Sequence, residues 1–396
     1  MEKNNNQSKG KVIGIDASNL LRGGGVTHLV ELLSAIKPEI HNINKVVIWA
    51  NENTLDLIND QPWLIKATPK EINSGFIYRL YWQKYKLSKA AEEAGCDLIL
   101  APGGSFFCKF RPIVTMSRNM LPFEWTEAKR YGFSWVTLRL MMLRYLQLKS
   151  FRNASGVIFL TKYAENRIIK LTGNLLGITT IIPHGLNTRF QIKPKEQKNI
   201  SKYNFDKPFR IIYVSIIDQY KHQWNVVEAV ANLRSRGYPV CLSLVGPSYP
   251  TSLNRLKKTI DRFDSNNDWV TYTGAVEYRD LHNLYSDSNL AIFASSCENM
   301  PNILLEKMAS GLPIASSNKG PMLEVLGDSG LYFDPEKSIE IFNVLETLIN
   351  NPQLRKEKAN SSFNVVQKYT WSRCAQETFS FLDDVIIENK KSLCVE

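Results

Sequence analysis

Two carboxylates that could serve a single ligand, Glu298 and Glu306, lie eight positions apart in the sequence. Residues 298–300 are expected to form a loop, and Pro301 suits the first turn of a helix, where its missing N–H costs nothing. That helix would continue through an apolar face and end at Gly311. Its first turn would direct backbone N–H groups and a partial positive charge toward the loop, which favours an anionic ligand group.

The spacing of the two acids fits a long ligand with polar groups at both ends. Eight helical positions span roughly 12 Å at about 1.5 Å per residue. A nucleotide diphosphate-sugar has a sugar at one end, a ribose nearer the other end and phosphates between them. One acid near each end and a helix N-terminus in the middle would match such a ligand. The alternative is an ordinary surface helix after a buried strand, with two solvated acids.

This stretch resembles the E-x7-E motif of retaining glycosyltransferase family four, whose members have the GT-B fold. The residues that match the family pattern are Glu298, Pro301, Glu306, Met308, Ala309, Gly311, Pro313 and Glu324. The resemblance implies that Glu306 accepts hydrogen bonds from the ribose hydroxyls of a nucleotide. It also implies that Glu298 holds a hydroxyl of the transferred sugar and favours the positive charge that develops at the anomeric carbon.

The leaving diphosphate also needs positive charge, from a metal ion or from fixed cationic groups. The sequence has no Asp-x-Asp pair to hold a metal ion on a diphosphate, so we expect neither a metal ion nor a cofactor. Lys221 matches a lysine that the family places on the diphosphate, but the family's arginine is replaced by Ile216 or Ile217. Lys221 would then carry more of this role or share it with Arg22, Arg118 or His222. The alternative for Lys221 is a solvated loop lysine.

Further donor contacts are implied around the helix start and at two other strand ends. The backbone N–H groups of Asn299, Met300 and Asn302 could reach sugar and phosphate oxygens. Contacts to the base would come from around Gly246 and Tyr272, and the identity of the base stays open.

A glycine-rich turn follows the first expected strand. A strand over residues 11–16, the turn at 22–26 and a helix through 29–36 are typical of a Rossmann-like unit, in which glycines let the backbone approach a phosphate. Neither G-x-G-x-x-G nor a P-loop is present, so an ordinary strand–helix turn stays an alternative. Members of the family carry such a loop near the donor phosphates and the acceptor, which implies that Gly24 and Gly25 contact the donor.

The catalytic position of the first domain departs from the family pattern. Many members have a histidine here, and counting back from Pro122 puts Arg118 in its place. A guanidinium is a poor general base, but it binds sugar hydroxyls and phosphates. We therefore expect Arg118 in the catalytic site, with an ion pair to Glu124 or Glu127 as the alternative. Residues that could contact the acceptor are Arg22, Ser117 and Asn119.

Strands that alternate with helices predict an α/β fold with parallel, doubly wound sheets, and 396 residues suggest two domains. The resemblance implies the GT-B fold, in which two Rossmann-like domains face each other across a cleft. The expected division is a loose tail at 1–10, an acceptor domain at 11–195, a linker at 196–208, a donor domain at 209–372 and a C-terminal helix at 373–396 that crosses back to the first domain.

The net charge of +11 is unevenly distributed. Residues 1–200 hold 28 Lys/Arg and 15 Asp/Glu, whereas residues 201–396 hold 21 and 23. A basic first half could face an anionic membrane surface, a phosphate-bearing acceptor or nucleic acid, although a well-solvated basic surface would look the same. We assign the apolar face of an expected basic helix at 135–152 to the core rather than to membrane contact.

Other features favour a cytoplasmic protein. No apolar run approaches the ~18 residues of a membrane span, and the polar N-terminus does not look like a signal peptide. The six cysteines are scattered, which favours reduced thiols and argues against a zinc site. Association with the inner face of a membrane is compatible with these features.

The sequence therefore predicts a retaining, metal-independent hexosyltransferase. It would move a sugar from a nucleotide diphosphate-sugar to a glycan or lipid-linked acceptor in bacterial surface-polysaccharide biosynthesis, without binding nucleic acid. One alternative is a nucleotide-sugar epimerase or a phosphorylase on the same fold. Another is a non-catalytic basic protein that binds a membrane surface or nucleic acid, but this alternative leaves the carboxylate pair unexplained.

Overall fold

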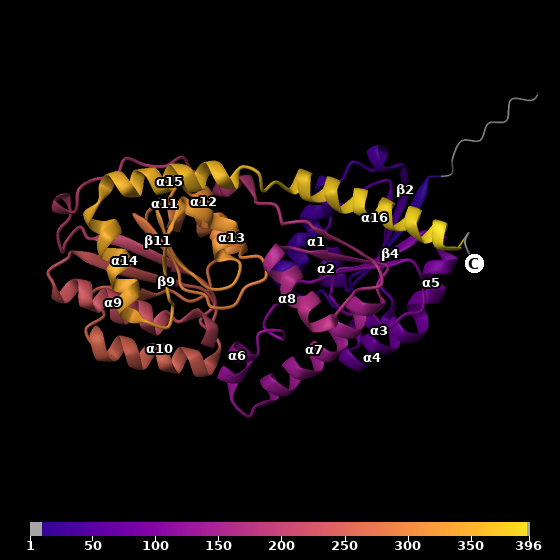
Figure 1. The fold of residues 1–396 in the computed structure, drawn as a ribbon, viewed down its shortest axis with the longest axis horizontal. Coiled ribbons are helices and arrows are strands. Elements are labelled where there is room, and N and C mark those ends of the chain that lie inside the picture. The colour runs from indigo at the N-terminus through magenta and orange to yellow at the C-terminus, as the bar shows by residue number, and fades with distance from the viewer. Residues whose placement is uncertain (1–9, 394–396) are drawn as a thin grey trace, which may run out of the picture. The chain divides into compact units, whose positions relative to one another are not determined.

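The computed structural model describes residues 10–393 and divides into two compact α/β units (Figure 1). Unit 1 comprises residues 1–119, 141–185 and 370–396, and unit 2 comprises residues 120–140 and 186–369. The expected tail lies outside the described residues, except for Gly10. Residues 120–140 are grouped with unit 2, although they lie between two consecutive strands of the unit 1 sheet.

Unit 1 is built on a seven-stranded parallel sheet with the strand order β3-β2-β1-β4-β5-β6-β7. Strands β4 to β6 are buried along their whole length, as expected for apolar strands of a parallel sheet covered on both faces. The strands are β1 Lys11–Asp16, β2 Ile43–Trp49, β3 Leu64–Ala67, β4 Leu98–Ala101, β5 Ile113–Met116, β6 Gly156–Phe159 and β7 Ile178–Ile181.

Unit 1 contains helices from both the N-terminal and the C-terminal parts of the chain. The C-terminal helix α16 packs against α1. The helical segment that runs from Phe76 to Glu93 is divided by a π-helical turn at Trp82–Lys86. The helices are α1 Gly24–Ala35, α2 Glu52–Leu55, α3 Lys70–Asn73, α4 Phe76–Tyr81, α5 Leu87–Glu93, α7 Trp135–Asn153, α8 Lys162–Thr172 and α16 Trp371–Leu393; the first six residues of α7 are assigned to unit 2.

Unit 2 is built on a six-stranded parallel sheet with the strand order β10-β9-β8-β11-β12-β13. Its strands are β8 Phe209–Val214, β9 Val240–Val245, β10 Val270–Tyr272, β11 Leu290–Phe293, β12 Ile314–Ser317 and β13 Leu331–Phe333. Its helices are α6 Trp125–Ala128, α9 Gln223–Ser235, α10 Pro250–Phe263, α11 Leu281–Ser286, α12 Asn302–Ala309, α13 Met322–Leu326, α14 Ser338–Asn350 and α15 Pro352–Val366.

The strand order of unit 2 reverses at β8. From β8 the chain adds β9 and β10 on one side, and it then returns to add β11, β12 and β13 on the other side. Strands β8 and β11 are hydrogen-bonded neighbours, with Leu290 opposite Ile211. The loops that leave their carboxyl ends therefore emerge side by side, which is where open α/β sheets bind ligands.

The expected apolar face of the helix at 135–152 is only partly in the core. Leu140 and Phe151 are buried in α7, as expected. A second apolar stripe of the same helix is exposed, and the assignment of these side chains to the core was wrong, because periodicity alone does not show which side of a helix meets solvent. The exposed side chains are Trp135, Leu138, Met141, Met142 and Tyr145.

Candidate active site

The loop between β11 and α12 carries Glu298 to the switch point of the unit 2 sheet. Helix α12 begins at Asn302, with Pro301 as its N-cap residue, so the helix starts one residue later than the sequence suggests. Glu298 forms an ion pair through its Oε1 atom with the Nζ atom of Lys221, and both side chains are largely buried. The two residues are 77 positions apart, and the structure joins them as the pairing of β8 with β11 requires.

Lys221 is held by its own loop. It ends the 3₁₀ turn η6 (Gln219–Lys221), whose N-cap residue Asp218 accepts a hydrogen bond from the backbone of Gln219. The Lys221 backbone carbonyl accepts a hydrogen bond of 2.7 Å from the Tyr213 hydroxyl. Its Nζ atom lies 5.4 Å from the centroid of the Phe293 ring on the neighbouring strand. The alternative of a solvated loop lysine does not describe this buried side chain.

Glu306 lies within α12 and is buried. Its Oε2 atom accepts a hydrogen bond of 3.3 Å from the Tyr285 hydroxyl. Burial raises the pKa of Glu306 to about 7, although hydrogen bonds from Tyr278 and Tyr285 and the charge of Lys307 act in the opposite direction. The carboxyl group is thus already coordinated by hydroxyl groups, which is the chemistry that ribose hydroxyls would also offer.

A fourth ionisable residue, Lys307, belongs to this cluster and was not predicted. It is fully buried, and its Nζ atom donates a hydrogen bond of 3.2 Å to the Val214 carbonyl. The same nitrogen lies 5.0 Å from the ring centroid of Tyr213 and 4.6 Å from that of Phe293. Burial, together with the positive charge of Lys221, lowers the pKa of Lys307 well below its usual range. The only sequence signal for Lys307 is its place next to Glu306.

The residues around the start of α12 are also largely enclosed. Asn299 and Met300 are buried, and Asn302 is partly buried. Among the described residues, the Asn302 Oδ1 atom is buried without a hydrogen-bond partner. A buried polar atom normally has a partner, so this oxygen could accept a hydrogen bond from a ligand hydroxyl.

Gly246 and Tyr272 lie together at the ends of two neighbouring strands, as expected for one part of a site. The Tyr272 hydroxyl donates a hydrogen bond of 3.0 Å to the Gly246 carbonyl. Gly246 has φ of +142°, and a Cβ atom there would lie 2.2 Å from the Ser215 carbonyl oxygen. Only glycine fits this position, which brings the loop after β9 against the loop after β8.

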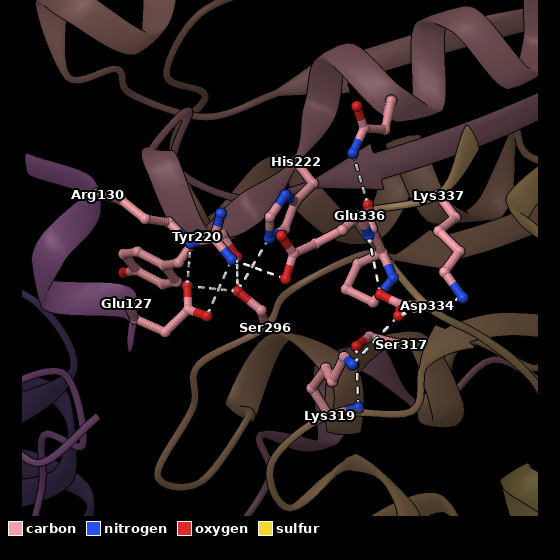
Figure 2. A network of polar contacts seen from close by, with 12 residues as sticks. Glu127, Arg130, Tyr220, His222, Ser296, Ser317, Lys319, Asp334, Glu336 and Lys337 are labelled. Atoms are coloured by element: carbon pink, nitrogen blue, oxygen red, sulfur yellow. Dashed lines mark hydrogen bonds and ion pairs between the residues drawn. The ribbon is translucent and has the colours of Figure 1, made fainter. Parts of the chain in front are cut away.

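A polar network surrounds Ser296 in the loop between β11 and α12 (Figure 2). The Ser296 hydroxyl donates to Glu127 Oε2 at 2.7 Å, and the His222 Nε2 atom lies 2.9 Å from the hydroxyl oxygen. Glu127 also accepts a hydrogen bond of 2.7 Å from Arg130, which in turn contacts Glu336 Oε1 at 2.8 Å. Burial, and then the charge of Arg130, lowers the pKa of His222 to about 4, so His222 is neutral at pH 7.

This network was not predicted from the sequence. Ser296 lies 169 positions from Glu127, and one sequence contains no signal for such a pairing. A second contact of the same segment, the hydrogen bond of 2.8 Å from Tyr131 to Asp218, reaches the turn that carries Lys221. Residues 127–131 therefore support both loops that hold the Lys221–Glu298 ion pair.

In unit 1, Arg118 lies against the glycine turn. One of its terminal nitrogens donates to the Gly24 carbonyl at 2.7 Å, and the other lies 3.1 Å from His28 Nδ1. A Cβ atom on Gly25 would lie 3.8 Å from the same guanidinium group. Burial lowers the pKa of Arg118 to about 10, so the group is charged at pH 7. The alternative pairing partner Glu127 binds Arg130.

The other residues expected on the acceptor side of unit 1 differ in exposure. Arg22 and Asn119 are exposed, and Ser117 is buried, with its backbone N–H bonded to the Ile158 carbonyl at 2.9 Å. Two buried histidines next to Arg118 were not predicted: the ring of His28 lies 4.5 Å from that of His184 between centroids. Burial lowers the pKa of both histidines well below its usual range, so both are neutral at pH 7.

Within residues 10–393, no group of three or more His, Cys, Asp or Glu side chains could hold a metal ion. None of the helices in this range combines the length and the apolar character that crossing a bilayer requires. Independence from metal ions stays a prediction.

Residues 195–364 match the family model for glycosyl transferases, group 1. Solved GT-B glycosyltransferases resemble the chain over more than nine-tenths of its length. The chain therefore has the fold of GT-B glycosyltransferases. This result confirms the expected α/β class and the expected fold. The matched segment includes Lys221, Glu298 and Glu306, whereas Arg118 lies outside it.

Curated relatives are distant in sequence. O-antigen chain mannosyltransferase B of Escherichia coli is 27% identical over 112 residues, which cover 28% of this chain and 29% of that protein. An uncharacterized glycosyltransferase of Haemophilus influenzae is 21% identical over 389 residues, which cover 93% of this chain and 98% of that protein. These matches support a glycosyltransferase without fixing its sugar or acceptor.

Solved structures of other proteins show the same fold. Sucrose-phosphate synthase from Thermosynechococcus elongatus has a TM-score of 0.74 at 17% identity, covering 96% of this chain and all of that chain. Anabaena HepE in complex with UDP-glucose has a TM-score of 0.67 at 18% identity, covering 94% of this chain and 99% of that chain. At such identities the likeness shows the fold alone.

Proposed function

We propose that the protein is a retaining, metal-independent glycosyltransferase of family four. It takes a hexose or deoxyhexose from a nucleotide diphosphate-sugar and transfers it to a glycan or lipid-linked acceptor. The observation that carries the proposal is the combination of a buried Lys221–Glu298 ion pair with the hydroxyl-coordinated carboxyl group of Glu306. A buried cation flanked by two acids suits a ligand that is anionic in the middle and rich in hydroxyl groups at both ends.

Each of these residues has a distinct role in the proposal. Glu306 accepts hydrogen bonds from the ribose hydroxyls in place of the Tyr285 hydroxyl. Lys221 and the first turn of α12 stabilise the negative charge on the leaving diphosphate. Glu298 binds a hydroxyl of the transferred sugar and stabilises the positive charge at its anomeric carbon. The backbone near Asn299 and Met300 donates hydrogen bonds to sugar and phosphate oxygens.

Retention of configuration fits the absence of a strong protein base at Arg118. The bond between the anomeric carbon and the diphosphate oxygen breaks while the acceptor oxygen forms its bond on the same face. The departing phosphate oxygen takes the proton of the acceptor hydroxyl, so the protein need not remove it. Arg118 is charged at pH 7 and contributes by binding a hydroxyl or phosphate rather than by taking a proton.

The proposed ligand class and cellular role have support from named relatives. HepE was solved with UDP-glucose, which favours a nucleoside diphosphate-sugar as donor. A partial match to an O-antigen chain mannosyltransferase favours a role in bacterial surface-polysaccharide biosynthesis. We propose that the protein acts in the cytoplasm, where nucleotide-sugars are available.

A panel of nucleoside diphosphates in a melting assay, followed by product analysis, tests this function. At least one diphosphate should raise the Tm in the presence of EDTA, and its sugar derivative should be consumed only when an acceptor is added. Consumption without an acceptor would identify an epimerase instead. The absence of any Tm shift across the panel would contradict the proposal.

A further inference from the structure

One face of unit 1 exposes an unusual number of large apolar side chains. Helix α4 and the following π-helical turn expose Ile77, Tyr81 and Tyr85, which are spaced four residues apart and therefore lie on one side of the helix. Ile77 is 77% exposed, and the rings of Tyr81 and Tyr85 lie 5.3 Å apart between centroids. Phe76 and Tyr78 are also exposed. Single exposed apolar residues are ordinary, but a cluster marks an interaction site.

Helix α7 adds a second apolar stripe. Met141, Met142 and Tyr145 are exposed at helical spacings of three and four residues, and Tyr145 is 67% exposed. The opposite side of α7 holds buried residues such as Phe151, so the helix has two apolar faces and only one of them is covered.

The two stripes flank a basic pocket within unit 1. A cavity of about 450 Å³ is lined by Lys84 from the π-helical turn, by Arg111 and by Leu146 and Lys149 from α7. Because one pocket joins residues of both elements, the π-helical turn and the C-terminal half of α7 lie close together. We call the exposed side chains of α4, of the π-helical turn and of residues 141–153 of α7, together with Arg111, the apolar–basic surface.

The charge of the apolar–basic surface has a single sign. Residues 76–86 contain three Lys/Arg, residues 103–111 contain two and α7 contains four, and none of these segments contains an Asp or Glu. A surface that faces only water usually mixes both signs of charge. Aromatic and aliphatic side chains interspersed with unopposed cations are typical of segments that lie in a membrane interface.

We propose that the apolar–basic surface docks unit 1 onto a bilayer that contains anionic phospholipids. The exposed tyrosines, Ile77 and the α7 stripe enter the boundary between headgroups and acyl chains. Lys84, Arg111 and Lys149 bind lipid phosphates, with the pocket taking one headgroup. None of the helices in residues 10–393 can span a bilayer, so the protein lies on the membrane. The inference concerns unit 1 and does not depend on the donor chemistry proposed for unit 2.

Flotation of the intact protein with vesicles tests the proposal. The wild type should float with vesicles of equal parts phosphatidylglycerol and phosphatidylcholine and not with phosphatidylcholine alone, and added salt should release it. The variant Lys84→Gln/Lys86→Gln/Lys149→Gln should bind about 100-fold more weakly, since each cation near an anionic surface favours binding by roughly fivefold. The variant Ile77→Ser/Tyr81→Ser/Tyr145→Ser should lose binding to the same vesicles by about 10-fold or more.

Matched controls separate this surface from general effects. Lys202→Gln/Lys207→Gln/Lys356→Gln removes three exposed lysines of unit 2 and should bind within about twofold of the wild type. Ile40→Ser/Leu57→Ser/Ile339→Ser removes exposed apolar residues from other elements and should also bind normally. Each variant should keep the wild-type Tm, which reports folding. Each should also keep the Tm shift that the wild type shows with a nucleoside diphosphate, which reports donor binding.

Three results would overturn the proposal. The wild type could fail to float with anionic vesicles, or the Lys84 variant could bind as tightly as its lysine control. Alternatively, sedimentation could show a wild-type dimer that the Ile77 variant abolishes, which would mean that a second copy of the chain covers this face. A Tm shift retained in any of these cases would leave the proposed donor chemistry intact.

Discussion

The Nζ atom of Lys221 and the Oε1 atom of Glu298 form a buried ion pair that joins the loops after strands β8 and β11. An ion pair taken out of water stabilises a protein little on balance, whereas the loss of one partner leaves an uncompensated buried charge. The Lys221–Glu298 pair therefore points to a role in ligand binding rather than in stability. The diphosphate and the sugar of a donor would each take one partner of the pair.

Replacing Lys221 should affect catalysis and stability together. Lys221→Ala removes the cation proposed for the leaving diphosphate and should lower kcat by roughly 100- to 1000-fold. It also leaves Glu298 buried without its partner, which should lower the free energy of unfolding by about 3–5 kcal/mol. Steady-state kinetics and denaturant unfolding measure the two effects.

A surface lysine provides the control for Lys221. Lys319 pairs with Asp334 at 3.3 Å but is 40% exposed, so Lys319→Ala should cost about 1 kcal/mol or less. If Lys221→Ala retained wild-type turnover, the role of Lys221 at the diphosphate would be rejected.

Glu306→Gln should weaken donor binding in a manner that depends on pH. Burial raises the pKa of Glu306 to about 7, so the carboxylate that we propose binds the ribose hydroxyls is lost as the pH falls through 7. The affinity of the wild type for a nucleoside diphosphate should therefore drop between pH 8 and pH 5.5. The Gln variant should bind weakly across this range, and calorimetry at several pH values measures both proteins.

The same group makes the ligand-free protein less stable at high pH. The folded pKa near 7 lies above the unfolded value near 4.5, so the folded protein holds the proton more tightly. The protonated Glu306 carboxyl group therefore contributes roughly 3 kcal/mol to the free energy of unfolding below pH 4.5, and this contribution is lost as the pH rises through 7. Glu306→Gln should thus raise the Tm relative to the wild type at pH 8 but not at pH 5. An exposed-acid control, Asp261→Asn, should show no such crossover.

The structure brings two of the candidates chosen from the sequence, Glu298 and Lys221, together for a physical reason. Glu298 and Lys221 follow apolar strands of a parallel sheet, and the strand order then brings the two loops together. The burial of Lys307 could not be predicted, because a lysine next to Glu306 looks like part of a polar helix face. The pairing of Ser296 with Glu127 depends on how residues 120–140 fold back onto unit 2, which local patterns do not encode.

Gly246→Ala should destabilise unit 2 more than an ordinary glycine substitution. Gly246 combines φ of +142° with a Cβ position 2.2 Å from a backbone oxygen, so the loop after β9 must move. Gly237→Ala is the matched control, because Gly237 has φ of +86° and open space around its Cβ position. The control should lose about 1–2 kcal/mol of stability from strain alone, and Gly246→Ala should lose more and bind nucleoside diphosphates poorly. Equal losses in the two variants would exclude a special role for this close contact.

Arg118→Ala should lower turnover without weakening donor binding. Arg118 contacts Gly24 and His28 within unit 1, and its removal should lower turnover by about 10- to 100-fold with little change in nucleoside diphosphate affinity. Arg118→Lys keeps the charge but not the forked geometry, so it should restore only part of the activity. Wild-type turnover of Arg118→Ala would make this arginine a structural residue of the glycine turn.

The most direct test of the account is a crystal structure with a nucleoside diphosphate, grown in EDTA. The account predicts phosphate oxygens within hydrogen-bond distance of Lys221 Nζ and of the first turn of α12, with Glu306 bonded to the ribose hydroxyls. A diphosphate bound away from this helix start, or one that binds only when magnesium is restored, would contradict it.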